Sequence, residues 1–495
     1  MARIPTAHRE RGGEPRAGAR AFRGAAEIKV TGAFKVVLVN PYELGRQPFA
    51  LAQPAAWLKR DGFAVSCLDL SLQKLDAEVL QDAGLVAVYV GMHTATRIAV
   101  QALPRIRLLA PEAHLCVYGL YAPMNEALLR GLGVDTVLGG EVEPALASLC
   151  RRLRIDGDPR VQSEPVISLA KMAFEVPDRS GLPKLSRYAH LVLPDGSTRV
   201  AGFAEGSRGC KHLCRHCPVV PVYQGTFRIV PADTVMQDIR QQVKEGATHI
   251  SFGDPDFFNG PTHGLRLARA LHEAFPQVTF DATIKIQHLI DHGALLPELR
   301  ASGCLFITSA VEAVDDEILR HLDKNHTSRD FDQAVALTGA AGIALAPTFV
   351  AFTPWTTLEG YLALLERLVE LQLVESVPPV QLTIRLLVPE GSWLLKLPGF
   401  RERLLGFDAA LLGYPWIHRD PRVDRLQQDV QAEVARCEQQ SVPRREVFAA
   451  VWRMAHEAAA RPAPELPGDL GAPIPRLSEP WYCCAEPTEQ QLQSF

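Results

Sequence analysis

Residues 206–218 read Gly206-Ser207-Arg208-Gly209-Cys210-Lys211-His212-Leu213-Cys214-Arg215-His216-Cys217-Pro218. Three cysteines fall within eight residues at the spacing C-x3-C-x2-C, so a short loop can turn three thiolates toward one point. This pattern predicts that Cys210, Cys214 and Cys217 hold a metal or an iron–sulfur cluster. Three thiolates leave one iron of a four-iron cluster without a protein ligand, and that iron is free to bind another molecule.

A structural zinc knuckle that also uses His212 and His216 is the alternative interpretation of this loop. Zinc knuckles usually draw paired ligands from two separated segments. The sequence has no second C-x2-C pair, although Cys483 and Cys484 lie near its end. The iron–sulfur interpretation is therefore favoured, and stoichiometric zinc in a colourless protein would support the alternative.

The loop resembles the cluster motif of the radical S-adenosylmethionine (SAM) enzymes. In that superfamily the open iron of a [4Fe–4S] cluster chelates the amino-acid part of SAM. The resemblance implies that SAM is a cofactor or substrate and that the chain is an enzyme.

Composition is that of a soluble globular protein with two to four domains. The chain has 495 residues, of which 47% are apolar and 22% are charged, with a formal net charge of −4. This balance gives no support for a nucleic acid or a membrane as an obligatory partner, and the sequence has no apolar run long enough for a transmembrane helix. Ten cysteines in such a chain indicate cofactor or redox chemistry in the cytoplasm rather than a disulfide framework. Residues 1–28 are predicted to be a disordered basic tail without the apolar core of a secretory signal.

Residues 29–155 are predicted to form an α/β domain with an open, doubly wound parallel sheet. Apolar runs that close on turns predict its five strands, at 35–41, 63–69, 85–91, 115–119 and 135–141. Helical segments lie between these runs. Ligands of such sheets bind beyond the carboxyl ends of the strands.

This domain resembles the cobalamin-binding domain that precedes the catalytic barrel in many radical SAM proteins. The likeness lies in the residues at the strand ends, and it makes these the candidate cobalamin-binding residues: Asn40, Gly91, Thr94, Gly119, Gly139 and Glu141. One departure is the loop Asn40-Pro41-Tyr42-Glu43-Leu44-Gly45, which lacks the D-x-H-x-x-G motif that gives cobalt a histidine. Either cobalamin binds without a histidine ligand, or the domain has lost the cofactor.

Residues 156–200 are predicted to be a connector that ends in a hairpin around Asp195-Gly196. Residues 201–395 follow as repeated βα units behind the cysteine loop. They predict a partial (β/α)6 barrel of the radical SAM type, with strands near 248–252, 278–283, 304–310, 343–350 and 381–386. The chemistry of such a barrel is expected at the carboxyl ends of its strands.

Two of these strand ends are candidate SAM-binding segments by resemblance. Gly253 would let the backbone approach SAM, and Asp254 or Asp256 would pair with its ammonium group, although a turn or helix N-cap explains an Asp equally well. Ser309 and Glu312 resemble the segment that reaches the ribose of SAM. The alternative for Glu312 is an acid that favours the dipole of a following helix.

Residues 396–460 predict a helical appendage, and residues 461–495 a Pro-rich linker with a tail. The tail reads Trp481-Tyr482-Cys483-Cys484-Ala485-Glu486-Pro487 and resembles that of the CUAEP/CCAEP-tail radical SAM proteins, in which selenocysteine can replace a cysteine. That exchange implies a chemical role for Cys484. Cys483 and Cys484 are therefore candidate catalytic thiols, either as a redox pair or as a carrier.

The sequence as a whole predicts a cytoplasmic radical SAM enzyme with a [4Fe–4S] cluster, SAM and cobalamin. An external electron donor of the flavodoxin or ferredoxin type is expected, and the substrate is an unidentified small molecule or peptide. Two alternatives come from other classes. One is a zinc-knuckle binding module, and the other is a corrinoid- or metal-binding protein that never turns SAM over.

Overall fold

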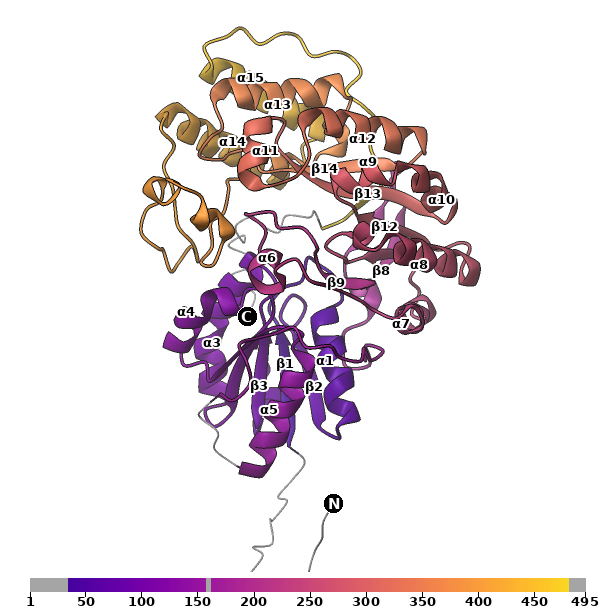
Figure 1. Ribbon diagram of the computed structural model, residues 1–495, viewed down its shortest axis with the longest axis vertical. Coiled ribbons are helices and arrows are strands. Elements are labelled where there is room, and N and C mark those ends of the chain that lie inside the picture. The colour runs from indigo at the N-terminus through magenta and orange to yellow at the C-terminus, as the bar shows by residue number, and fades with distance from the viewer. Residues whose placement is uncertain (1–33, 157–161, 480–495) are drawn as a thin grey trace, which may run out of the picture. The chain divides into compact units, whose positions relative to one another are not determined.

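The computed structural model describes residues 34–156 and 162–479, and Figure 1 shows their helices and strands. The described residues form one compact unit. The predicted tail at 1–28 and the thiols Cys483 and Cys484 lie outside the described residues.

The N-terminal sheet has six parallel strands in the order β2-β1-β3-β4-β5-β6. They are β1 (Lys35–Asn40), β2 (Ala64–Asp69), β3 (Leu85–Tyr89), β4 (His114–Tyr118), β5 (Thr136–Gly140) and β6 (Ile167–Ser168). Five of them confirm the predicted doubly wound sheet, and β6 adds a strand from the predicted connector.

Both faces of this sheet are covered by helices, as the continuous apolar run of β1 requires. Val36 and Leu38 pack with α1 (Phe49–Arg60) and α5 (Glu143–Asp156) on one face. Val37 and Val39 pack on the other face, where the core includes residues of α2 (Ala77–Leu80), α3 (His93–Leu109) and α4 (Glu126–Gly131). Because side chains alternate along a strand, β1 supplies both cores.

The second sheet has the order β14-β13-β12-β11-β8-β7-β15. Its five parallel strands form a half-barrel: β8 (Thr198–Ala204), β11 (His249–Phe252), β12 (Thr279–Thr283), β13 (Cys304–Glu312) and β14 (Ala344–Phe349). The predicted sixth strand near 381–386 is instead a 3-10 turn, η6 (Pro379–Leu382), followed by a single parallel bridge between Phe352 and Arg385.

Helices pack on the outer side of the half-barrel and share one core with its strands. They are α7 (Ala232–Lys244), α8 (Pro261–Ala274), α9 (Ile286–Asp291), α10 (Leu296–Ala301), α12 (Ser328–Ala340) and α13 (Leu358–Glu370), while α11 (Asp316–Leu322) packs in a separate small core. Short elements complete this part: α6 (Val219–Tyr223), the hairpin of β9 (Ser207–Gly209) with β10 (Phe227–Ile229), and the turn η3 (Phe257–Asn259).

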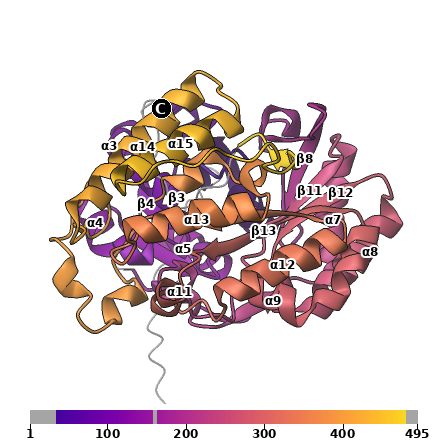
Figure 2. The same ribbon diagram turned by 90° about the horizontal axis from the view of Figure 1, so that it is seen from above.

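The C-terminal region extends the same core, as predicted for a helical appendage. The helices α14 (Pro421–Gln439) and α15 (Arg444–Ala458) pack on one another, and α15 also packs on α13. Figure 2 shows these three helices side by side.

The connector hairpin is confirmed, because β7 (His190–Val192) pairs antiparallel with β8. After α15 the chain runs extended, in keeping with its prolines, until β15 (Arg476–Leu477) pairs antiparallel with β7. The hydroxyl of Tyr42 then donates to the carboxylate of Glu479. The segment before the tail therefore returns to the N-terminal domain.

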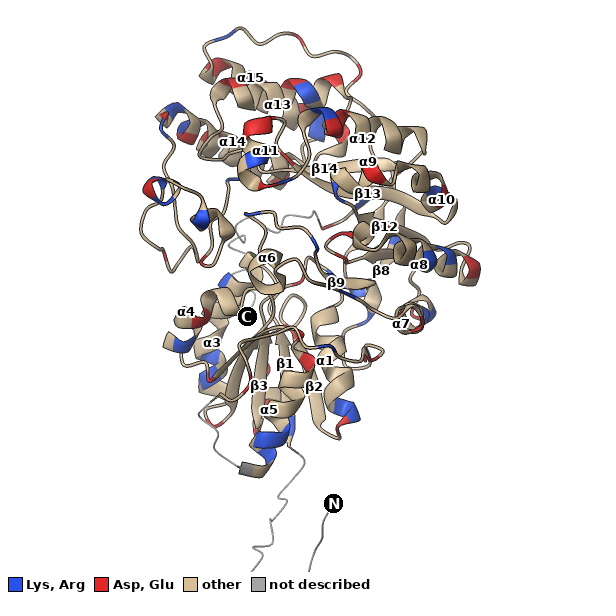
Figure 3. Cartoon of the chain, viewed as in Figure 1, with Lys and Arg blue, Asp and Glu red and all other residues tan. Residues whose placement is uncertain are grey.

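Charged residues of both signs alternate over the helices of both sheets (Figure 3). No helix of the described chain is long and apolar enough to cross a membrane.

Candidate active site

The three cysteines lie in the loop that follows β8 and β9, at the carboxyl end of the half-barrel. None of the three forms a disulfide with another described cysteine; Cys214 is buried, and Cys210 and Cys217 are partly buried. Gly209 begins the loop with φ of +72°, and a Cβ there would lie 2.4 Å from the carbonyl oxygen of Thr226. Only glycine tolerates both conditions, so the hairpin fixes where the loop begins.

Two buried lysines supply positive charge at the thiols. Lys285 follows β12, and its charge interacts with Cys214 and Cys210. Lys324 follows α11; burial opposes its charge, but Glu312, Cys214 and Cys217 raise its pKa above the ordinary value. Burial raises the pKa of the Cys210 thiol to about 11. A metal ion deprotonates a coordinating thiol outright, so the lysines favour the state in which the thiols are ligands.

Glu312 ties the cysteine loop to the end of β13. Its carboxylate accepts from His216 Nε2 at 3.0 Å and from Lys324 Nζ at 3.2 Å. Burial would raise the pKa of Glu312, but Lys324 and His216 lower it to about 2. The backbone of Glu312 has φ of +71°, a strained conformation for a residue with a Cβ, and such strain is concentrated at functional sites.

Asp254 holds the start of the same loop. Its carboxylate accepts from the backbone N–H of Gly206 at 2.9 Å and from Ser207 Oγ at 2.5 Å. Burial raises the pKa of Asp254 to about 7. The adjacent Gly253 packs so closely on Phe203 that a Cβ would lie 1.9 Å from its ring. Asp254, in the predicted SAM-binding segment, therefore holds the start of the cysteine loop in place.

Asp256 caps η3, since its Oδ1 accepts from the backbone N–H of Phe258 at 3.1 Å. Asp256 therefore has the N-cap role that was the alternative to SAM binding. Its second oxygen faces His288 and His212.

Two buried side chains at the strand ends have no hydrogen-bond partner among the described residues. Ser309 Oγ lies on β13 with a residue exposure of 0%, and Lys285 Nζ follows β12 with 7%. Buried polar groups are nearly always paired, so both are candidates to contact a bound molecule. Ser309 was predicted from the sequence and Lys285 was not. The local signal that could have revealed Lys285 is its place two residues after the buried strand that ends at Thr283.

The predicted cobalamin-binding residues do not gather in one place. Asn40 donates to Asp69 at 2.9 Å in the buried end of β1, and Thr94 is buried in the first turn of α3. Gly139 packs on Pro123, where a Cβ would lie 2.3 Å from the proline ring.

Gly91 and Gly119 line a pocket of about 250 Å³ between the carboxyl ends of the N-terminal strands and the cysteine loop. Tyr89 fills the space above Gly91, since a Cβ there would lie 2.0 Å from its hydroxyl oxygen. His93 points elsewhere and contacts the carbonyl oxygen of Leu411 at 2.7 Å.

Glu141 reaches the cysteine loop through Arg208. The Arg208 guanidinium forms ion pairs with Glu141 at 3.2 Å, with Glu143 at 2.8 Å and with Glu205 at 3.0 Å. Glu141 and Glu143 are buried, so Arg208 connects the N-terminal sheet to the loop that carries the thiols. The sequence analysis singled out Glu141 alone of these four, because charges that come together only in the fold leave no local pattern.

A protein-family model matches the part of the chain that carries the cysteine loop. Residues 205–356 match the model described as the radical SAM superfamily. Among curated proteins, the hopanoid C-3 methylase of Methylococcus capsulatus is 24% identical over 328 residues, 62% of this chain and 62% of that protein. The ribosomal protein uS12 methylthiotransferase RimO of Geobacter sulfurreducens is 22% identical over 220 residues, 41% of this chain and 49% of that protein. The chain thus covers less than two thirds of the length of either relative.

Solved structures share the fold of both domains. The radical SAM methyltransferase TsrM of Kitasatospora setae, solved with tryptophan substrate and a SAM analogue, has a TM-score of 0.55 at 19% identity and matches 68% of this chain and 71% of its own. The cobalamin-dependent SAM radical enzyme OxsB, solved with aqua-cobalamin, has a TM-score of 0.63 at 16% identity and matches 81% of this chain and 66% of its own. Residues 205–356, which include the cysteine loop and most of the half-barrel, thus match the radical SAM superfamily, and the chain shares the fold of the solved enzymes TsrM and OxsB.

Proposed function

We propose that the chain is a radical SAM enzyme, with its [4Fe–4S] cluster on Cys210, Cys214 and Cys217. The observation that carries the proposal is the set of buried polar groups without hydrogen-bond partners around the three cysteine thiols. Lys285 Nζ and Ser309 Oγ are buried without partners, and Lys324 adds a second cation. When bound, the cluster supplies the electron that cleaves SAM to methionine and a 5′-deoxyadenosyl radical. An external donor, of the flavodoxin or ferredoxin type, reduces the cluster.

The residues of the chain bind and orient SAM. Lys285 suits the carboxylate of its methionine part, because an ammonium buried without a partner gains most from an anion. Ser309 contacts the ribose, and Gly253 lets the backbone approach. Glu312, held ionised by Lys324 and His216, keeps the loop and the ribose-binding end of β13 in register. Asp254 does the same for Gly206 and Ser207.

Cobalamin is the second cofactor of the proposal, bound without a histidine ligand. The fold shared with OxsB and TsrM supports it, as does the pocket at the carboxyl ends of the N-terminal strands, where ligands of such sheets bind. None of the residues that line this pocket is a histidine. Its volume of about 250 Å³ is small for a large ligand, and the Tyr89 side chain takes up part of the space beside Gly91. Bound cobalamin would supply a methyl group for transfer to carbon.

The tail carries the remaining part of the proposal. Cys483 and Cys484 act as a redox pair or as a carrier of a substrate group. Adjacent cysteines bridge only through a strained ring, so a disulfide between them would be easily reduced. The return of the chain to Tyr42 through Glu479 supports a tail that begins beside the N-terminal domain.

The decisive test is anaerobic reconstitution with iron and sulfide, followed by SAM and a reductant. We expect four irons and four sulfides per chain, and 5′-deoxyadenosine detected by mass spectrometry. An intact cluster that forms no 5′-deoxyadenosine would contradict the proposal and favour a protein that binds metal or corrinoid without turnover. Stoichiometric zinc in a colourless protein would favour a zinc knuckle.

Cobalamin and the tail need separate measurements. Titration with hydroxocobalamin should give one bound corrinoid, and the EPR spectrum of its Co(II) form should lack the nitrogen splitting that a histidine ligand produces. Cys484→Ser should leave 5′-deoxyadenosine formation intact and change the product formed from a substrate extract. An unchanged product spectrum would remove the tail from the mechanism.

A further inference from the structure

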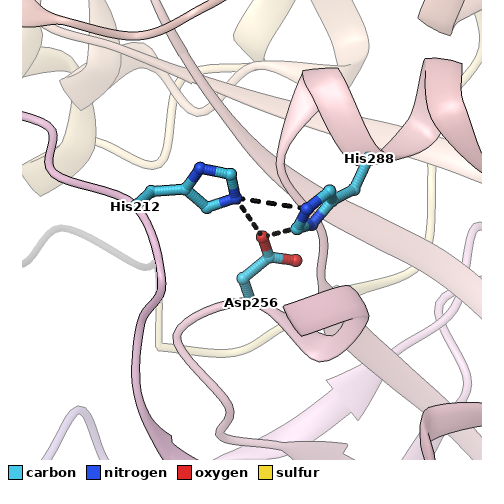
Figure 4. Close-up of side chains that lie close together, drawn as sticks. All are labelled: His212, Asp256 and His288. Atoms are coloured by element: carbon cyan, nitrogen blue, oxygen red, sulfur yellow. Dashed lines mark hydrogen bonds and ion pairs between the residues drawn. The ribbon is translucent and has the colours of Figure 1, made fainter. Parts of the chain in front are cut away.

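His212, Asp256 and His288 converge beside the cysteine loop from three separate parts of the chain. His212 lies between Cys210 and Cys214, Asp256 caps η3 after β11, and His288 lies on α9 after β12. One donor atom from each residue lies within 4.8 Å of the others. Figure 4 shows the two rings and the carboxylate turned toward a common point.

The distances between the donor atoms suit a single small cation. His212 Nε2 lies 3.2 Å from His288 Nε2 and 3.6 Å from Asp256 Oδ2. Ligands at about 2.0–2.1 Å from a tetrahedral zinc ion are separated by roughly 3.3 Å. The two measured separations lie on either side of that value, so the donors can close on one ion with small movements.

A contact inside the cluster orients one of its rings. Asp256 Oδ2 lies 2.6 Å from His288 Nδ1 as an ion pair, which leaves His288 Nε2 directed toward His212. Both residues have an exposure of 2%. In metal sites a carboxylate at the second ring nitrogen of a histidine fixes the orientation of the ring, so this buried pair suits an ion that His288 binds through Nε2.

We propose that His212, Asp256 and His288 bind one divalent transition-metal ion, separate from the [4Fe–4S] cluster. Two imidazoles and one carboxylate form a ligand set used for zinc and for non-haem iron, and three protein ligands leave a further position open. The ion would fix His212, and with it the segment between Cys210 and Cys214, to η3 and α9. The inference does not depend on SAM cleavage.

The first measurement is the zinc content of the protein with its cluster in place, so that the thiols are occupied. The anaerobically reconstituted full chain is treated briefly with a chelator, dialysed against zinc and analysed for iron and zinc. We expect one zinc per chain in addition to the cluster iron. The zinc X-ray absorption spectrum should show nitrogen and oxygen ligands at about 2.0–2.1 Å, whereas zinc held by thiolates would show sulfur at about 2.3 Å.

Substitutions assign the ion to these residues. His288→Gln, Asp256→Asn and His212→Gln should each weaken zinc retention about tenfold or more, with unchanged cluster iron. His292→Gln is the matched control, because its ring lies 5.8 Å from that of His288 and belongs to no donor cluster. If the buried substitutions prevent folding, His212→Gln decides, since its side chain is partly exposed.

Three results would overturn the inference: no zinc in a wild-type protein with a full cluster, zinc with sulfur ligands, or equal retention by His212→Gln and the wild type. Each would leave a hydrogen-bonded Asp–His–His chain as the role of the residues. Because 5′-deoxyadenosine is measured separately, failure of the metal site and failure of SAM cleavage can be told apart.

Discussion

The carboxyl ends of the two parallel sheets differ in how far their buried polar groups are paired. The strand ends of the N-terminal sheet are called the filled site, and those of the half-barrel the open site. At the N-terminal sheet, polar side chains at the strand ends bind one another: Asn40 binds Asp69, Asp69 binds Tyr188, and Glu141 binds Arg208. Of these residues, only one oxygen each of Asn40 and Glu141 lacks a donor in the described chain. At the half-barrel, Ser309 and Lys285 are buried with no hydrogen-bond partner in the described chain.

This difference distinguishes residues that stabilise the fold from residues that are candidates to bind a ligand. A satisfied buried network contributes to stability and loses it when one member is removed. A buried group without a partner lowers stability and gains its value only on binding. Substitutions at the N-terminal sheet should therefore cost stability, and substitutions at the half-barrel should cost binding.

The largest effect is expected for Cys214→Ser at the open site. The variant should lose the cluster, because one of only three thiolate ligands is gone, and SAM cleavage should fall to the background without enzyme. Iron, sulfide and 5′-deoxyadenosine analyses measure this. Cys67→Ser, on the partly buried part of β2, is the control and should keep all three at wild-type levels.

Lys285→Met should change binding and stability in opposite directions. Loss of the ammonium should weaken SAM binding roughly 10- to 100-fold, the equivalent of a hydrogen bond to a charged group. Without cofactors, the same variant should be more stable by about 1 kcal/mol, because an unpaired buried cation is replaced by an apolar chain.

Equilibrium binding of SAM to the reconstituted protein and thermal unfolding of the cofactor-free protein measure the two effects of Lys285→Met. The exposed Lys244→Met should change neither. A variant that loses stability and keeps SAM affinity would mean that Lys285 is a structural residue, and the contrast between the two sheets would fail.

The sequence predicted five strands of the N-terminal sheet and the five parallel strands of the half-barrel, because apolar runs and turn residues are local signals. It also predicted Cys210, Cys214, Cys217 and Ser309, which lie in short motifs. It did not reveal Lys285, Arg208 or the His212–Asp256–His288 cluster. Arg208 meets Glu141 and Glu143, and His212 meets Asp256 and His288, across tens of residues of the chain, so these groups come together only in the fold. The pair His288 and His292 does have H-x3-H spacing, a local signal, but only one of the two joins the cluster.

The sixth barrel strand shows another limit of local patterns. The apolar stretch near 381–386 has the composition of a strand, but the structure forms η6 there and a single bridge at Arg385. The side-chain oxygen of Gln381, rather than a backbone carbonyl of a sixth strand, accepts from the backbone N–H of Phe349 at 3.0 Å. A side chain that takes the place of a backbone partner ends the sheet, and periodicity does not reveal that competition.

At the filled site, Tyr188→Phe should destabilise the protein without changing SAM cleavage. The Tyr188 hydroxyl donates to the buried Asp69 carboxylate at 2.7 Å, and a hydrogen bond to a buried charge is worth about 2 kcal/mol. Urea unfolding measures the loss. Tyr414→Phe is the control, because the Tyr414 hydroxyl donates to Glu390 at an exposed position, where such a bond contributes little. Equal losses in the two variants would contradict the contrast.

The smallest expected effect is a dependence on pH at the filled site. Burial, with the nearby charge of Glu205, raises the pKa of Glu43 from 4.5 to about 8. The folded protein therefore keeps a proton on Glu43 that the unfolded chain releases above pH 4.5. Its contribution to stability is complete below pH 4.5 and is lost as the pH rises toward 8. Because Glu43 is only partly buried, we expect a loss of about 1 kcal/mol.

Glu43→Gln should remove this component, so that the variant becomes more stable than the wild type near pH 8 and differs least near pH 5. Thermal unfolding between pH 5 and 8 measures it, and the exposed Glu112→Gln should follow the wild-type curve. If the stabilities of the wild type and the variant change with pH in the same way across this range, Glu43 is ionised in the folded protein. In that case the charge of Arg46, which lowers the pKa of Glu43, would dominate over burial.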